Sequence, residues 1–256
     1  MSEQTRRRIR ISPFRKNMCE LMRLARNIPL VTAERRMNLA ELVEARKASA
    51  LRPSWTVIFS KAFATVSARR PELRTCYMSF PYPHFYEHPS SSAMVIVERE
   101  YRGERFPMNY RLRKTDQSTL LELHQQLEHY RTGPLETDEN FRIMRRLGRT
   151  PNPFCRLLWW LGYHWTGSRR ARYFGTFGLS SPAIGGAGLT TILSPLTCTL
   201  HYSLFNDSGE IDMRITFDHR AIDGAPVARA LTEMEQVLAT EVLAEIKRLP
   251  KANQAA

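Results

Sequence analysis

The stretch Phe217-Asp218-His219-Arg220-Ala221-Ile222-Asp223-Gly224 lies where one periodic pattern of the chain ends and another begins. Polar and apolar residues alternate over 210–217, which is the period of a half-buried strand. Apolar residues recur at helical spacing over 225–249, and Gly224 supplies a flexible joint between the two elements. The sequence therefore predicts a strand, then a turn that carries His219, and then a long helix.

His219 is the residue of this turn that can act as an acid or a base near neutral pH. A neutral imidazole takes a proton from a thiol or hydroxyl near pH 7 and later returns it, and the end of a strand holds the ring on a rigid base. Asp223, four residues further on, is placed to orient the turn or to offset a nearby arginine. The alternative is a surface turn in which Asp218, His219 and Asp223 only hydrogen-bond the backbone. Such a short motif does not decide between the two by itself.

Other blocks of the chain carry a family resemblance together with this motif. In order and spacing they resemble the catalytic domain of the dihydrolipoyl acyltransferases of 2-oxoacid dehydrogenase complexes, members of the chloramphenicol acetyltransferase-like superfamily. The stretch from about 79 to 172 matches only weakly. The matching blocks are Pro13-Phe14-Arg15-Lys16-Asn17-Met18, Asn27-Ile28-Pro29-Leu30-Val31-Thr32, Leu42-Val43-Glu44-Ala45-Arg46-Lys47, Lys61-Ala62, Arg70-Pro71-Glu72-Leu73, Gly175-Thr176-Phe177-Gly178-Leu179-Ser180-Ser181 and Gly185-Gly186.

The resemblance implies a role for each residue of the motif. His219 matches the general base that removes a proton from the acceptor thiol. Asp223 matches an acid that the family holds in a buried ion pair, and Arg15 is the candidate partner by its position. Gly224 completes the His-x-x-x-Asp-Gly motif as a structural residue of the site.

Ser180 matches the hydroxyl that hydrogen-bonds the tetrahedral oxyanion, a donor typically worth about 3 kcal/mol of barrier. Without the resemblance, Ser180 and Ser181 are more simply explained as residues of a glycine-rich turn that bond the backbone. Pro182 departs from the usual family pattern and restricts Ser181 to an extended conformation.

Length and periodicity predict one domain. A chain of 256 residues with 43% hydrophobic residues buries a substantial core. Helical patterns cover 13–25, 39–50, 54–69, 118–130 and 225–249, and strand patterns cover 29–36, 94–99, 106–112, 173–179, 197–204 and 210–217, which is a mixed α/β order. The resemblance implies a chloramphenicol acetyltransferase-like two-layer sandwich with a mixed sheet flanked by helices. We predict a basic N-terminal arm at 1–12, a single catalytic domain at 13–249 with a divergent Arg/Trp-rich insertion at about 138–172, and a flexible tail at 250–256.

The resemblance also implies substrates and assembly. Coenzyme A or an acyl-CoA is the expected substrate, with no tightly bound cofactor. Because the resemblance begins near residue 9, a lipoyl group would be presented in trans by another protein; a carrier-protein thiol or a small molecule are the alternative acceptors. Relatives form trimers in which the histidine comes from one chain and the oxyanion serine from its neighbour. The polar end of this chain predicts an isolated homotrimer.

The composition of the chain indicates where in the cell the protein lies and which kinds of partner it binds. No apolar stretch follows the basic residues near the N-terminus and no apolar run is long enough to cross a bilayer, so we expect a cytoplasmic protein. The four cysteines are scattered along the chain, which is typical of proteins whose thiols stay reduced. Neither the cysteines nor the histidines show the spacing of metal ligands, so no metal is expected. A net charge of +13 attracts anions such as the phosphates of coenzyme A. The absence of a nucleic-acid-binding motif argues against nucleic acid as the partner.

The Trp-rich segment at 153–165 lies between two arginine clusters and predicts a short apolar helix. Such a helix either lies on an anionic membrane, lines a channel for an acyl chain, or packs against the domain or another subunit. Three functions therefore stay open: a stand-alone acyltransferase, a catalytically silent trimeric scaffold, and a membrane-peripheral module. The intact His219 motif favours the first.

Overall fold

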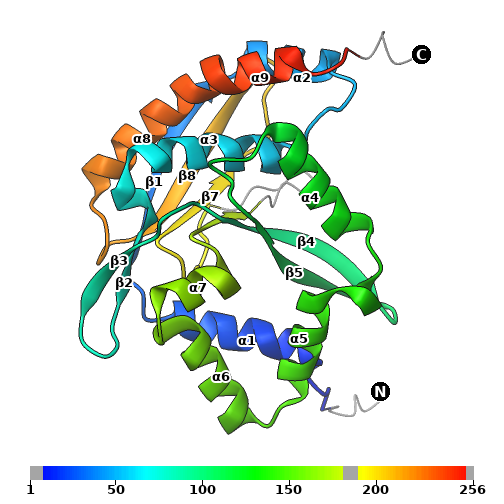
Figure 1. The fold of residues 1–256 in the computed structure, drawn as a ribbon, viewed down its shortest axis with the longest axis vertical. Helices are drawn as coiled ribbons and strands as arrows, with labels where there is room; N and C mark the ends of the chain where they lie inside the picture. The colour runs from blue at the N-terminus through cyan, green and yellow to red at the C-terminus, as the bar shows by residue number, and fades with distance from the viewer. Residues whose placement is uncertain (1–7, 181–189, 252–256) are drawn as a thin grey trace, which may run out of the picture.

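The computed structural model describes residues 8–180 and 190–251. Part of the predicted N-terminal arm and most of the predicted tail lie outside these residues, as do Ser181, Pro182, Gly185 and Gly186. A six-stranded mixed sheet crosses the middle of the molecule (Figure 1). Its order is β1-β8-β7-β6-β4-β5, from β1 (Leu30–Asn38), β4 (Ala93–Tyr101), β5 (Glu104–Leu112), β6 (Phe177–Ser180), β7 (Cys198–Tyr202) and β8 (Glu210–Asp218).

β6 pairs in parallel with both β4 and β7, and the other neighbours in the sheet are antiparallel. A separate hairpin pairs β2 (Thr75–Met78) with β3 (His84–Glu87). The α/β class and the mixed sheet flanked by helices that the sequence predicts are therefore confirmed.

The helices gather in two groups at opposite ends of the molecule, separated by the sheet (Figure 1). The α3 group consists of α2 (Ala40–Ala48), α3 (Trp55–Arg69), α8 (Gly224–Val237) and α9 (Leu243–Arg248), with a π-helical turn at Leu238–Val242; α4 (Leu120–Thr132) lies beside it. The α6 group consists of α1 (Pro13–Ala25), α5 (Glu139–Arg149), α6 (Asn152–His164) and α7 (Gly167–Phe174). Short 3-10 turns occur at Pro71–Arg74 and Leu135–Thr137.

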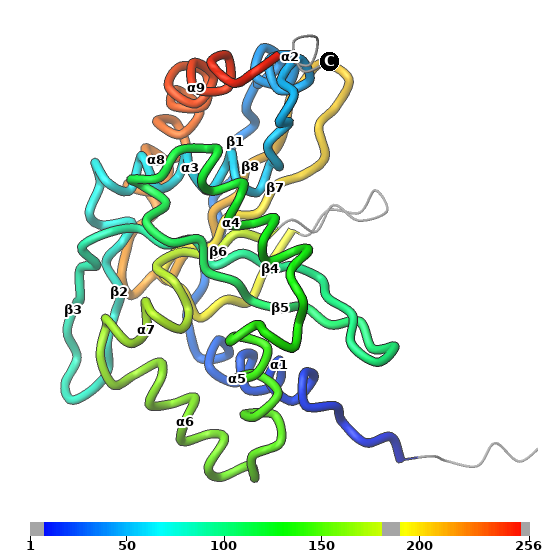
Figure 2. Tube along the Cα trace, turned by 45° about the vertical axis from the view of Figure 1, so that its right-hand side comes forward, coloured from blue at the N-terminus to red at the C-terminus, as the bar shows by residue number. Residues whose placement is uncertain are grey.

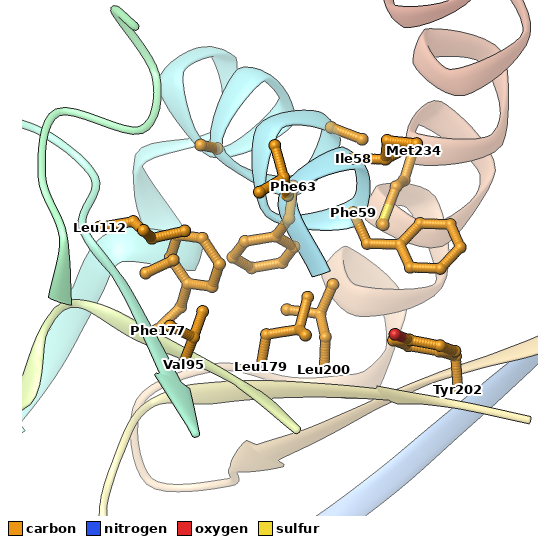
Figure 3. Close-up of a cluster of buried hydrophobic side chains, with 14 of the residues drawn as sticks. Ile58, Phe59, Phe63, Val95, Leu112, Phe177, Leu179, Leu200, Tyr202 and Met234 are labelled. Atoms are coloured by element: carbon orange, nitrogen blue, oxygen red, sulfur yellow. The ribbon is translucent and has the colours of Figure 1, made fainter. Parts of the chain in front are cut away.

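The main core lies between α3 and the sheet (Figure 3). Phe59 and Phe63 of α3 point at the strands, and the Phe63 and Phe177 ring centroids are 4.6 Å apart. Met234 reaches the same core from α8. Because this face of α3 is almost wholly apolar, burying it supplies much of the driving force for this half of the fold.

A smaller cluster occupies the other face of the sheet. Met94 neighbours the core residue Val95 on β4, so its side chain points to the opposite face. There it meets Trp159 and Tyr163 of α6 and Phe174 of α7. The Trp-rich helix predicted at 153–165 is thus present, and one of its faces packs against the domain.

The sequence prediction fails at the entry to β6. Residues 173–179 were expected to form one strand, but Tyr173 and Phe174 belong to α7 and the strand begins at Phe177. Thr166 caps the start of α7 by accepting the Arg169 N–H, and Gly175 ends the helix with φ 75°. A Cβ at Gly175 would lie 2.8 Å from the Ser92 carbonyl oxygen, so only glycine fits this position.

Within the described ranges, no helix is both long and apolar enough to span a membrane. The same residues contain no group of three or more histidine, cysteine or acidic side chains that could hold a metal ion. Cys19 is exposed, and the other three cysteines are buried and unpaired.

Candidate active site

The turn after β8 is built around the buried carboxylate of Asp218. Its Oδ1 accepts the Arg220 backbone N–H at 3.0 Å and Nε at 2.9 Å, and its Oδ2 accepts Arg220 Nη2 at 2.8 Å. The hydrogen bond to Asp218 raises the pKa of Arg220. The Arg220 guanidinium also lies over the Tyr77 ring, 4.6 Å from its centroid. A buried charge is retained at low cost only when paired in this way, so the pair fixes the turn.

His219 projects from this fixed turn. Its backbone N–H donates to the Pro29 carbonyl oxygen at 3.0 Å, which ties the turn to the start of β1. The imidazole is 46% exposed, and its Nδ1 lies 3.5 Å from Asp223 Oδ1. Because Nδ1 faces the carboxylate, Nε2 is left to face a substrate. The predicted placement of His219, at a strand end and open to an incoming group, agrees with this geometry.

The predicted environment of Asp223 is wrong for the single chain. The sequence places Asp223 in a buried ion pair with Arg15, but its side chain is 81% exposed and contacts His219 instead. No ion pair joins Arg15 to Asp223 among residues 8–180 and 190–251. Arg15 lies in the first turn of α1, whereas Arg23, at the other end of that helix, lines a hollow together with Arg220. Arg23 is itself paired with Glu20, at 2.7 Å.

Ser180 ends β6, and strand register places it far from His219 of the same chain. Ser180 pairs with His201 on β7, and His201 pairs with Arg214 on β8. His219 follows Arg214 by five residues along β8. With about 3.3 Å per residue and about 4.8 Å between strands, the two side chains lie roughly 20 Å apart. A single chain therefore does not bring the predicted base and the predicted oxyanion donor together.

A buried polar chain crosses the sheet from His201, the strand partner of Ser180, and no local sequence pattern indicates it. His201 is fully buried, and its Nε2 lies 3.0 Å from Thr216 Oγ1. Thr216 Oγ1 is in turn 2.8 Å from Thr32 Oγ1 on β1. These contacts link the neighbouring strands β7, β8 and β1. Only the alternation of side chains across paired strands brings the three residues to one face.

A small hollow of about 150 Å³ adjoins the His219 turn. Its wall is formed by the end of α1, the inner side of α6 and the Arg220 side chain. His164, on this wall, lies 3.1 Å from Ser79 Oγ through its Nδ1. Burial, with Arg170 and Arg220 nearby, lowers the pKa of His164 to about 4, so its ring is neutral at pH 7. The hollow is thus aromatic and polar, and Arg220, the residue after His219, connects it to the turn.

The comparisons with known proteins concern the fold. No protein-family model matches the chain, and a search of curated proteins finds no match. Solved structures do match, with low sequence identity. The truncated catalytic core of the 2-oxoacid dehydrogenase multienzyme complex from Thermoplasma acidophilum aligns with TM-score 0.64 and 13% identity over 92% of this chain and 99% of that one.

Two acetyltransferases are also similar. The dihydrolipoamide acetyltransferase of Azotobacter vinelandii aligns with TM-score 0.62 and 18% identity over 94% of this chain and 95% of that one. A chloramphenicol acetyltransferase aligns with TM-score 0.50 and 13% identity over 86% of this chain and 94% of that one. The chain therefore has the fold shared by the catalytic cores of dihydrolipoamide acetyltransferases and chloramphenicol acetyltransferase, as its sequence resemblance implied.

Proposed function

We propose that this protein is an acyltransferase that moves an acyl group between a CoA-type thioester and a thiol acceptor. The observation that carries the proposal is His219, held at the open end of β8 by the buried Asp218–Arg220 pair, in a fold that acetyltransferases share. The structure from Azotobacter vinelandii comes from work on a serine, a histidine and an asparagine in the catalytic mechanism, with the asparagine four residues after the histidine. Asp223 has the same spacing from His219.

The proposed reaction begins with proton transfer from the acceptor thiol to His219 Nε2. The thiolate attacks the thioester carbonyl, and the negative charge moves to the carbonyl oxygen of a tetrahedral intermediate. The Ser180 hydroxyl of a neighbouring chain donates a hydrogen bond to that oxygen. The intermediate then collapses, the carbon–sulfur bond to coenzyme A breaks, and the leaving thiolate takes the proton back from the imidazolium.

The separation of His219 and Ser180 supports a site shared between subunits. At roughly 20 Å along and across the strands, the two side chains cannot act on one carbonyl within a chain. A cyclic homotrimer brings the β8 end of one chain against the β6 end of the next, and each interface then holds one complete site. The +13 charge of the chain suits a substrate that carries phosphates, as coenzyme A does.

The first test is consumption of acetyl-, succinyl- and longer acyl-CoA by the full chain with dihydrolipoamide, alongside His219→Ala. Loss of general base catalysis costs about 10²–10⁴ in rate. A wild type that assembles but turns over no donor, or a His219→Ala chain with unchanged turnover, would favour the silent scaffold instead.

The second test addresses the shared site directly. His219→Ala and Ser180→Ala chains are each expected to be weakly active, since one lacks the base and the other the oxyanion donor. Unfolding and refolding them together yields mixed trimers in which about a quarter of the interfaces hold both intact residues. Recovery of activity on mixing supports the shared site. No recovery, from particles shown by mass to be mixed, would contradict a site built from His219 of one chain and Ser180 of the next.

A further inference from the structure

The helix α6 has apolar residues on two opposite faces. Its inner face, with Cys155, Trp159 and Tyr163, packs in the smaller cluster. A helix that is apolar all round is normally enclosed by protein or lipid. Here the outer face is open to solvent, with Phe154 63% exposed, Leu157 52% and Leu158 47%. These residues follow the spacing i, i+3 and i+4, so they form one continuous strip.

The β2–β3 hairpin extends this strip. Phe80, in the hairpin turn, packs against Trp160 and Trp165, with ring centroids 5.2 Å and 5.5 Å apart. Trp165 and the neighbouring Tyr82 are themselves exposed. Figure 2 shows α6 at one extreme of the molecule, with the hairpin beside it. The exposed apolar surface is therefore contributed by two elements that support each other.

Unpaired arginines lie on the preceding helix. Arg142, Arg145, Arg146 and Arg149 occur at i, i+3, i+4 and i+7 of α5, and with Glu136 and Phe141 they line a hollow of about 360 Å³. Across residues 8–180 and 190–251 none of the four forms an ion pair, and Arg145 alone donates a side-chain hydrogen bond, to Tyr101. Like charges at this spacing repel each other, so the stripe destabilises its own helix. Such a cost is consistent with a surface that binds an anion.

A second copy of the chain is a poor electrostatic match for the arginine stripe, because each copy carries a net charge of +13. Most carboxylates in the described residues already contact an arginine, lysine or histidine of the same chain, as Glu233 and Glu235 do on α8. Asp138 and Glu122 are used to cap helices. The partner of this region must therefore bring its own negative charge together with an apolar phase. An anionic lipid bilayer offers both, whereas a nucleic acid offers no apolar interior to the outer face of α6.

We infer that the outer face of α6, the β2–β3 hairpin turn and the arginine stripe of α5 form a docking surface for an anionic phospholipid membrane. The strip of Phe154, Leu157 and Leu158 enters the boundary between headgroups and acyl chains with α6 parallel to the membrane. The α5 arginines contact phosphate groups, and each contributes about fivefold to partitioning. This inference does not rest on His219, and binding is measured without turnover.

The test is co-sedimentation of the full chain with lipid vesicles. We expect binding to vesicles that contain phosphatidylglycerol, weak binding to pure phosphatidylcholine, and loss of binding as salt rises. Arg142→Gln/Arg146→Gln should weaken binding on the order of 20-fold. Its matched control is Arg229→Gln/Arg248→Gln, which removes the same charge from exposed positions on α8 and α9.

Leu157→Ser/Leu158→Ser tests the apolar contribution and should weaken binding by about tenfold or more. Its control is Leu193→Ser/Leu204→Ser, because these leucines are comparably exposed, at 51% and 49%. Circular dichroism and particle mass, measured for all four variants, identify any that misfold or dissociate. Where a double variant misfolds or dissociates, the single substitutions at the same positions are tested in its place.

Three results would overturn the inference. The first is equal binding to neutral and anionic vesicles, or equal loss in the controls. The second is a leucine variant that changes the mass of the particle while vesicle binding persists, which would make α6 a subunit contact. The third is binding of RNA, but not of vesicles, that the α5 substitutions abolish.

Discussion

The α3 group and the α6 group of helices pack against one sheet but are held in different ways. α3 buries nine of its 15 residues, and its arginines Arg69 and Arg70 form ion pairs with Glu241 and Glu233. α6 buries three of its 13 residues, and the arginines of the adjacent α5 form no ion pair in the described part of the chain. The first group thus satisfies its apolar and charged groups within the chain.

This contrast separates what holds the fold together from what is left for a partner. Contacts in the α3 group determine stability, because its core is shared by helices and strands from most of the sequence. In the α6 group, α1 and α5 contribute Phe14 and Phe141 to the main core, whereas α6 and α7 pack in the small cluster and leave apolar side chains exposed. The His219 turn lies between the two groups, since it leads into α8 while Arg220 reaches the hollow beside α6.

The largest difference between the groups should appear on removing a buried ring. Phe63→Ala leaves a cavity between α3 and the sheet and should lower the free energy of unfolding by about 3–5 kcal/mol. Phe174→Ala should cost less, about 2 kcal/mol, because this ring lies in the smaller cluster and is 8% exposed, so water reaches the vacated space more easily. Urea denaturation followed by circular dichroism measures both. Equal losses would show that the two clusters contribute alike.

Breaking the Asp218–Arg220 ion pair should have an intermediate effect on the free energy of unfolding. Asp218→Asn removes the charge that Arg220 binds at both oxygens and should cost about 2 kcal/mol, since the acid is buried. Asp212→Asn is the control. Its partner Arg36 is largely exposed, so the loss there should stay below about 1 kcal/mol. The Asp218→Asn chain should also lose turnover as the His219 turn loosens. Full activity in a destabilised Asp218→Asn chain would contradict a positioning role.

Mild acid should weaken the α6 side of the molecule. Burial, with Arg170 and Arg74 nearby, lowers the pKa of His88 to about 4. Because the unfolded chain takes up this proton near pH 6.5, stability is complete above that pH and falls as the pH drops toward 4. The loss from His88 between pH 7 and pH 5 should be about 2 kcal/mol, and His164 adds to it in the same direction.

His88→Gln removes one of the two titrating groups. Its loss of stability between pH 7 and pH 5, measured by urea denaturation, should be smaller than that of the wild type. An identical pH dependence in the two chains would mean that His88 titrates normally in the folded protein.

The sequence predicted well those elements that local periodicity decides. The strand at 210–217, the His219 turn and the helix that follows were all expected, since alternation, a glycine joint and helical spacing occur in succession there. The last two residues of α7 were predicted as the start of a strand over 173–179, whereas the Thr166 cap and the φ of Gly175 show that they end a helix.

The site could be predicted only in part, because its geometry depends on non-local pairing. The strand-end position of His219 followed from pattern. The distance of Ser180 from His219 depends on the parallel pairing of β6 with β7, which no local pattern encodes. The Arg15 error has a similar cause, because the sequence does not show which end of α1 faces the motif, and the structure places Arg23 there.

The smallest predicted effect tests whether the unpaired arginines of α5 lower the stability of the protein. Arg142 lies three and four residues before Arg145 and Arg146, so Arg142→Gln relieves two repulsive pairs and should raise the free energy of unfolding by about 0.3–0.5 kcal/mol. Arg131→Gln is the control. Arg131 is paired with Glu128, so its loss should lower stability by a similar amount. Opposite signs in the two variants, measured at low salt and converging at high salt, would mark α5 as a helix whose charges are kept for a partner rather than for stability. A destabilised Arg142→Gln chain would mean that other groups of the protein stabilise the arginine stripe. The two groups of helices would then not differ in how their charges are satisfied.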